Sequence, residues 1–204
     1  MWLPVGLFAG GVLIGAPVAF ALLLSGFGYM FWAGEYPSSV SSYLFTTLNS
    51  SSLLSIPFFI LAAEILNQSG ATRRLIDMID AWIGHNRGGL PVVAVIAVAF
   101  FSAICGSSAA TAAAIGSVMI PEMVGRGYDR RFTVGLIASA GGLGILIPPS
   151  IPLIVYGMVT EISISRLFQA AMLPGLVLAA VLCVVAYVVG SRSGVRPSER
   201  RPLG

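Results

Sequence analysis

Charged side chains are scarce in this sequence, and their scarcity excludes most classes of soluble protein. Only 9% of the 204 residues are charged, whereas an ordinary soluble domain carries about 25%. Hydrophobic residues make up 57% of the chain, and its mean hydropathy is +0.94. A soluble core of this length cannot bury so much apolar surface, so lipid must cover part of it. The composition therefore predicts a protein of the lipid bilayer.

Lysine is absent, and all 11 basic residues are arginines. They are too sparse for a nucleic-acid-binding patch, and a membrane surface is the electrostatic partner that we expect. Histidine occurs once, and the two cysteines, Cys105 and Cys183, lie inside apolar runs. Without a Cys-x-x-Cys pair or clustered histidines, neither a disulfide nor a histidine–cysteine metal site is expected.

An intramembrane hydrolase is the enzyme alternative. It would need a serine nucleophile beside a base, and the only histidine, His85, lies outside the apolar runs next to Asn86 and Arg87. A structural histidine at the membrane interface fits this position better. We therefore expect that the protein is not an enzyme.

Apolar runs and polar interruptions divide the chain into six segments. The segments are N-terminal transmembrane helices (1–70), an interfacial amphipathic helix (71–87), a re-entrant hairpin (88–125), a discontinuous transmembrane helix (131–160), a polar link followed by the last transmembrane helix (161–190), and a basic linker tail (191–204). The amphipathic segment alternates apolar and charged residues with a helical period. Together these segments predict an all-α membrane protein.

Arginine placement favours the hairpin over its alternatives. A single crossing at 88–125 would put Arg87 and Arg126 on opposite sides of the membrane. Two complete crossings keep them together, but each arm has only about fifteen residues and a crossing needs about twenty. A re-entrant hairpin leaves ten of the eleven arginines on one face and only Arg166 on the other. The excess of basic residues identifies that face as cytoplasmic.

The apolar stretch at 1–32 is too long for one upright helix. About thirty helical residues would measure about 45 Å, against a hydrocarbon core of about 30 Å. The stretch is either one tilted helix kinked at Pro17 or two short helices joined at 15–17. No charge at either candidate end decides between them.

Two interruptions of the apolar helices mark where chemistry is expected, since unpaired backbone in hydrocarbon persists only where it is packed in protein or lines a cavity. The first is the hairpin tip, 105–111, where helix ends meet Ser and Thr hydroxyls. The second, 141–152, combines glycines that permit unusual backbone angles with Pro148 and Pro149, which remove two backbone donors. Free carbonyls suit a small hard cation, and helix amides suit an anion. The alternative for the second break is a kinked helix with a glycine face for close packing.

These stretches resemble the large membrane subunit of TRAP transporters (tripartite ATP-independent periplasmic transporters, DctM type). The similarity is collinear over the whole chain and rests on the motifs at 15–20, 56–62 with Glu64, 100–111, 115–123, 127–128 and 141–152. It implies one inverted-repeat half of an ion-transporter-superfamily elevator transporter, with a re-entrant hairpin and a discontinuous helix. Such a half needs an odd number of crossings, which favours two N-terminal helices and an external N-terminus.

The resemblance also implies a function and partners. Members import organic acid anions, such as C4-dicarboxylates or sialic acids, across the bacterial inner membrane, with sodium as the coupling ion and no other cofactor. Expected partners are a small four-helix TRAP membrane subunit, a periplasmic substrate-binding protein, the second half of the large subunit, and the lipid bilayer. Because a complete subunit is about twice as long, a non-transporting helical fragment or packing subunit remains the alternative.

Site residues follow from the same resemblance. The implied sodium site places three residues of the tip, Gly106, Ser107 and Ser108, opposite Gly142, Gly144, Ile147 and Pro148, with Thr111 as a further candidate. The substrate residues that we predict are Ser107, Ser108, Pro149 and Ser150. Two acidic residues are left outside this site. Glu64 is either a proton or cation partner or a side chain that reaches the interface, and Glu122 is expected in a surface ion pair.

Overall fold

A computed structural model describes residues 2–34, 42 and 45–195, and these residues form helices without any β-strand. Contacts divide the chain into two compact units, Met1–Ser51 and Ser52–Gly204. The described part of the N-terminal unit includes α1 (Trp2–Leu13) and α2 (Val18–Ala33), and the larger unit holds the helices that carry both predicted interruptions.

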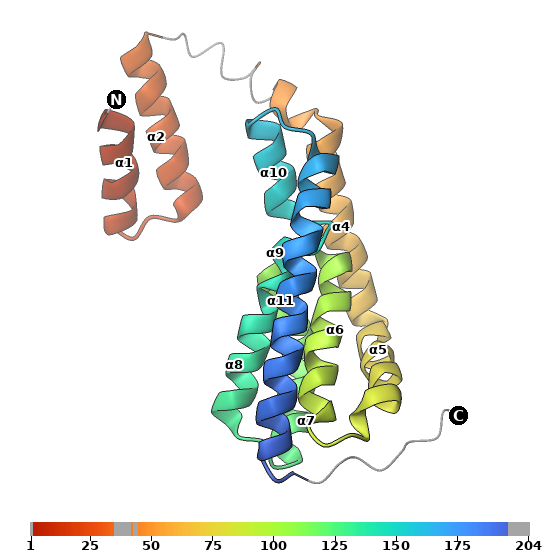
Figure 1. The fold of residues 1–204 in the computed structure, drawn as a ribbon. Coiled ribbons are helices and arrows are strands. Elements are labelled where there is room, and N and C mark those ends of the chain that lie inside the picture. Colours follow the sequence, from red (N-terminus) through yellow and green to blue (C-terminus); the bar gives the residue numbers. More distant parts are fainter. Residues whose placement is uncertain (1, 35–41, 43–44, 196–204) are drawn as a thin grey trace. The chain divides into compact units, whose positions relative to one another are not determined.

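The N-terminal unit is a helical hairpin of α1 (Trp2–Leu13) and α2 (Val18–Ala33) (Figure 1). The link between them contains Gly15 in the left-handed region, with φ of 82°, and Pro17 directly before α2. The helices pack closely at Gly11, where an added Cβ would lie 3.0 Å from the Cβ of Ala21. The Ser25 hydroxyl also donates to the Pro4 carbonyl at 2.7 Å. Of the two N-terminal alternatives, the structure thus shows two short helices.

The larger unit begins with α4 (Ser51–Gln68), α5 (Ala71–Ile79) and the short π-helix η1 (Asp80–Gly84). The chain bends by 70° between α4 and the α5–η1 segment, and Gly70 adopts φ of 74° at the bend. One face of α5 buries Ile76 and Ile79, while Arg73 and Arg74 on the other face are exposed. This is the amphipathic segment that the sequence pattern predicts.

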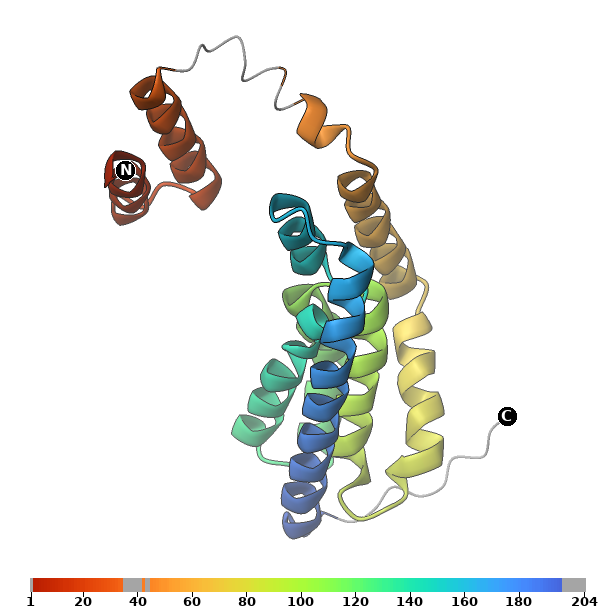
Figure 2. The ribbon, with the colours of Figure 1, turned by 45° about the horizontal axis from the view of Figure 1, so that its top comes forward.

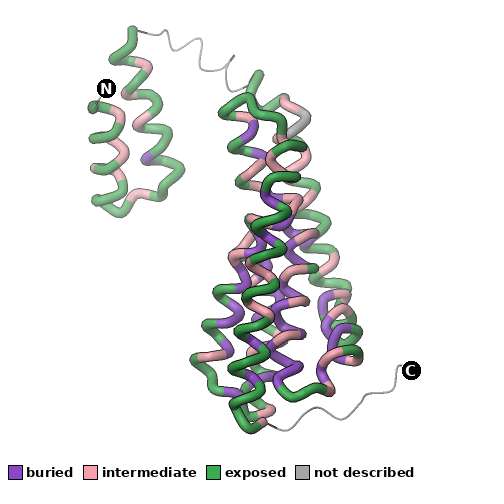
Figure 3. The backbone as a smooth tube through the Cα atoms, in the orientation of Figure 1, coloured by how far each residue is buried: buried purple, intermediate pink, exposed green. Residues whose placement is uncertain are grey.

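The hairpin consists of α6 (Gly89–Cys105) and α7 (Ser108–Gly125), and α6 is the centre of the unit. It contacts α5, η1, α7, α8, α9 and α11, and it lies between α5 and α11 in both ribbon views (Figures 1 and 2). Buried positions follow α6 and the sides of its neighbours that face it (Figure 3). The two arms have 17 and 18 residues and are longer than predicted, because α6 begins at Gly89 and α7 continues through Pro121 to Gly125.

The discontinuous helix consists of α8 (Arg130–Gly141), the single turn α9 (Leu143–Leu146) and α10 (Ile151–Val159). Asp129 caps α8, because its carboxylate accepts from the Phe132 amide at 2.9 Å. The main interruption is at 147–150, where the Pro148–Pro149 peptide is cis. The glycines do not adopt the unusual angles expected of them: Gly142 has φ of −57°, and neither Gly141 nor Gly144 has a positive φ. Their role is close packing, as described below.

The last helix, α11 (Ile164–Arg192), has 29 residues. Most of the polar link predicted at the start of 161–190 is therefore itself helical. The first turns of α11 pack against α10, where an added Cβ on Gly157 would lie 2.9 Å from Ile164 and 3.0 Å from Leu167. Beyond this contact α11 exposes apolar side chains, with Leu173 71% and Val184 62% exposed.

Within the described residues, three helical segments are long and apolar enough to cross a membrane: Ser108–Gly125, Arg130–Val159 and Ile164–Arg192. The bent pair Leu53–Gln68 with Ala71–Gly84 gives a fourth if it is counted as one span. The apolar helices α1, α2 and α6 are shorter. An all-helical fold with several apolar helices confirms the coarse expectation of an α-helical membrane protein.

Candidate functional site: the hairpin tip and the broken helix

The hairpin tip is a two-residue reversal between helices. Gly106 ends α6 with φ of 62°, a conformation that glycine adopts without the steric cost that a side chain would add. Ser107 is the N-cap of α7, and its hydroxyl accepts from the Ala110 amide at 3.5 Å. The carbonyl of Ser107 accepts from the Thr111 amide at 3.0 Å. The tip is thus ordered by local bonds that the Gly-Ser-Ser sequence provides.

The start of α10 is bonded to this tip. The Gly106 carbonyl accepts from the Ile151 amide at 3.2 Å, a contact across two segments that are far apart in sequence. An added Cβ on Gly106 would lie 2.7 Å from the carbonyl oxygen of Pro149. The two interruptions predicted from the sequence therefore touch, and they touch through their backbones.

The glycines of α8 and α9 bring the broken helix against the tip. An added Cβ on Gly144 would lie 2.8 Å from the amide nitrogen of Ser108 and 2.9 Å from the carbonyl carbon of Ser107. On Gly141 it would lie 3.0 Å from the Cβ of Ala112. The approach at Gly144 is closer than any side chain would allow, and the approach at Gly141 would require its neighbour to shift by a few tenths of an ångström.

Not all of the predicted residues meet at this contact. Five of them lie at the contact: Gly106, Ser107, Ser108, Gly144 and Pro149. Ser150 directly precedes Ile151, whose amide is bonded to the tip. An added Cβ on Gly142 would instead meet the Ser139 carbonyl of its own helix at 3.2 Å. The side chain of Ile147 faces α11, where its Cγ1 would lie 3.3 Å from a Cβ on Gly175.

Three buried hydroxyls lie on the helices that form the contact. Ser102, Thr111 and Ser150 are each 0% exposed, and their side-chain oxygens have no hydrogen-bond partner of ordinary geometry. Thr111 lies near the Cys105 thiol, which is only a weak hydrogen-bonding group. Buried polar groups without partners are rare in proteins, which makes these three hydroxyls candidate ligand groups. Of the three, Ser102 is the one that sequence reasoning did not single out; it is a lone hydroxyl in an apolar run, one turn before Gly106.

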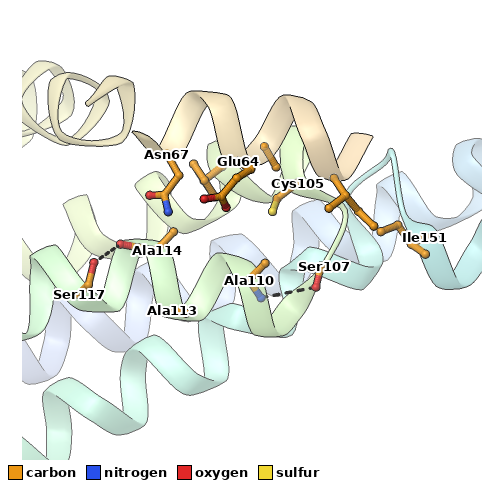
Figure 4. A pocket seen from close by; sticks show the side chains of 12 residues that line it. Glu64, Asn67, Cys105, Ser107, Ala110, Ala113, Ala114, Ser117 and Ile151 are labelled. Carbon is orange, nitrogen blue, oxygen red and sulfur yellow. Dashed lines mark hydrogen bonds between the residues drawn. The ribbon is translucent and has the colours of Figure 1, made fainter. Parts of the chain in front are cut away.

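A pocket of about 540 Å³ lies on the α4 side of the hairpin. Its polar lining comes from Glu64 and Asn67 of α4, Ser107 of the tip and Ser117 of α7, and Figure 4 shows Glu64 and Asn67 extending from α4 into this space. The Glu64 carboxylate accepts from the Gln68 amide at 2.7 Å. Glu64 thus shares a pocket with a tip residue, an arrangement compatible with the cation role that the sequence left open.

A charged cluster lies at the other end of α7. Arg126 pairs with Glu122 at 2.6 Å and with the buried carboxylate of Asp80 at 3.7 Å. Glu122 is therefore an ion-pair member, as predicted, and Arg126 connects η1 to the end of the hairpin. Burial raises the pKa of the adjacent Tyr128, and the Arg126 charge partly offsets that rise.

The fold is that of a helical membrane protein in which two interrupted helices meet through their backbones. The sequence pattern of the family described as "Tripartite ATP-independent periplasmic transporter, DctM component" matches residues 5–203, and the chain belongs to this family. Its relatives are transporter permeases and not enzymes.

Three curated relatives show the range of similarity. The C4-dicarboxylate TRAP transporter large permease protein of Pseudomonas aeruginosa is 49% identical over 75% of this chain and 36% of its own length. The 2,3-diketo-L-gulonate permease of Escherichia coli is 39% identical over 97% of this chain and 47% of its own. The ectoine/5-hydroxyectoine permease of Ruegeria pomeroyi is 36% identical over 93% of this chain and 45% of its own length. The chain thus spans less than half the length of these relatives.

Proposed function

We propose that the chain forms the N-terminal half of a sodium-coupled TRAP permease that imports organic acid anions delivered by a periplasmic binding protein. The observation that carries this proposal is the backbone contact between the hairpin tip and the broken helix at Gly106, Gly144 and Ile151. Interrupted helices persist in hydrocarbon only where they are packed in protein or line a cavity, and the tip residue Ser107 lines the pocket that Glu64 shares.

Sodium is the ligand that best fits the chemistry of the tip. A small hard cation prefers oxygen ligands, and interrupted membrane helices offer carbonyls at their C-terminal ends. The proposed ligands at the contact are Gly106, Ser107, Ser108 and Gly144, with Thr111 on the adjoining turn of α7. Gly142, Ile147 and Pro148 stay predictions from the family resemblance. The buried Thr111 hydroxyl, which has no strong partner, supports its place in this set.

The substrate carboxylate is assigned to two helix N-termini. Ser107 precedes α7 and Ser150 precedes α10, so amides at both starts carry partial positive charge. The Ser150 hydroxyl is buried without a partner and supplies a further polar group. With Ser108 and Pro149 these residues form this half's part of the substrate site.

The other half of the substrate site belongs to the second repeat of a complete permease, which moves as an elevator in the bacterial inner membrane. The partners of the complete permease are the small four-helix subunit and the periplasmic binding protein. Named relatives handle C4-dicarboxylates, 2,3-diketo-L-gulonate, isethionate and ectoine, so the class of small organic acids and not one compound is proposed.

The test is sodium-driven uptake of a C4-dicarboxylate by the complete permease and its partners in proteoliposomes. Ser107→Ala should raise the sodium concentration for half-maximal uptake, whereas Ser191→Ala, whose hydroxyl bonds to the Val188 carbonyl in the last turns of α11, should not. Equal sodium dependence in both variants would contradict the site. If the purified protein gains no thermal stability from sodium over potassium, the non-transporting alternative is favoured.

A further inference from the structure

A second cavity lies away from the tip, at the opposite end of α6. It is a groove of about 340 Å³ between η1, the start of α6 and the last turns of α11. Its walls are apolar, with Ile83, Val92, Cys183 and Val184, and its polar members are Asn86 and Tyr187. Val184 is 62% and Tyr187 52% exposed, so the groove is open on the outer side of the bundle.

A close backbone contact brings two arginines to one end of this groove. An added Cβ on Gly88 would lie 2.7 Å from the amide nitrogen of Ser191 and 2.8 Å from the carbonyl oxygen of Tyr187. Arg87 directly precedes Gly88, and Arg192 directly follows Ser191. Both arginines are exposed, and neither forms an ion pair with any residue in the described part of the chain.

The surroundings of the groove match a membrane interface. The neighbouring α5 is amphipathic, with Arg73 and Arg74 exposed and Ile76 and Ile79 buried, a pattern typical of helices at the membrane surface. Trp82 of η1 is 72% exposed, and with Tyr187 it supplies the aromatic side chains that are enriched at headgroup level.

We propose that this groove binds an anionic phospholipid: one acyl chain lies against the apolar wall, and the headgroup phosphate meets Arg87 and Arg192. Basic positions between membrane helices on the cytoplasmic side attract such headgroups, and arginine binds phosphate in a bidentate geometry. Two unpaired cations beside an apolar groove fit a phospholipid better than an apolar protein helix, which would leave both charges without partners.

The experiment measures lipid retention by the intact protein that carries this sequence, by native mass spectrometry after purification and exchange into mixed micelles. The micelles contain phosphatidylglycerol and phosphatidylcholine in equal amounts. We expect several-fold preferential retention of phosphatidylglycerol, and we expect Arg87→Gln/Arg192→Gln to abolish the preference. The matched control Arg73→Gln/Arg74→Gln removes two exposed charges from α5, and this variant should retain the preference for phosphatidylglycerol.

A second variant tests the groove itself. Val184→Trp fills the apolar wall without changing charge, and it should reduce retention of phosphatidylglycerol several-fold. Equal retention of the two lipids by the wild type, equal loss in both arginine pairs, or undiminished retention by Val184→Trp would each overturn the proposal. The last outcome would leave the groove to a protein partner.

Discussion

Gly144→Ala is the sharpest test of how the two helix interruptions meet. The added Cβ would lie 2.8 Å from the Ser108 nitrogen and 2.9 Å from both the Ser107 carbonyl carbon and the Ser108 Cα. All three are backbone atoms, so no rotation of a flexible side chain can relieve the contact. Restoring an ordinary separation of about 3.4 Å requires that the tip and α9 move apart by about 0.6 Å, the difference from 2.8 Å.

The expected cost follows from two opposing terms. Forcing a methyl group into a packed contact costs about 1–3 kcal/mol, whereas alanine gains up to about 1 kcal/mol over glycine in helix propensity. We therefore expect a net loss of about 1–2 kcal/mol, which lowers the Tm by about 2–8 °C for a chain of this size. Because the same shift separates the predicted ligands, the sodium concentration for half-maximal uptake should rise.

The assay combines thermal unfolding, with sodium or potassium present, with uptake by the complete permease. The matched control is Gly135→Ala on α8, where an added Cβ meets nothing within 4 Å. This control should be neutral or more stable, with unchanged sodium dependence. The reasoning is refuted if Gly144→Ala leaves both Tm and sodium dependence unchanged, or if Gly135→Ala lowers them equally.

Further substitutions probe other parts of the larger unit. Thr111→Val should weaken sodium-dependent stabilisation without destabilising the sodium-free protein, because it removes a buried hydroxyl that lacks a strong partner. In contrast, Thr133→Val breaks a 2.9 Å bond to a backbone carbonyl and should cost about 1 kcal/mol in unfolding experiments with or without sodium. Arg126→Gln removes both ion pairs at the end of α7 and should lower the free energy of unfolding by about 1–2 kcal/mol. The control Arg130→Gln, at the exposed start of α8, should change the free energy of unfolding by less than about 0.5 kcal/mol. Burial raises the pKa of Tyr128, so the phenol stays protonated to higher pH in the folded state than in the unfolded state, and the free energy of unfolding should fall above about pH 10. The difference in phenolate absorbance between the wild type and Tyr128→Phe measures this pKa. A Tyr128 phenol that titrates at its ordinary pKa would contradict the prediction.

The sequence was informative where a residue type acts locally. Prolines 148 and 149 cannot continue a helix, and Gly106 with Ser107 forms a C-terminal stop followed by an N-cap, so both interruptions could be located without coordinates. The amphipathic period of 71–87 likewise identified the inner face of α5. These signals depend on neighbours within one or two turns.

What the sequence could not provide depends on contacts between distant segments. The glycines of 141–144 permit either unusual angles or close approach, and only the position of Ser107 and Ser108 shows that close approach is used. The early start of α11 depends in the same way on Gly157 of α10. The pairing of Asp80 with Arg126 joins segments that no short pattern relates.

The bond from the Ile151 amide to the Gly106 carbonyl also sets an order of events during synthesis. Gly106 emerges from the ribosome about 45 residues before its donor, which at about 5–20 residues per second is a delay of about 2–9 s. A carbonyl left unpaired in hydrocarbon costs several kcal/mol, so the newly made hairpin is favoured to keep its tip near water during that interval. Final insertion of the tip is therefore coupled to arrival of α10, and a translational pause just before residue 151 should prolong exposure of Ser107 and Ser108 to water.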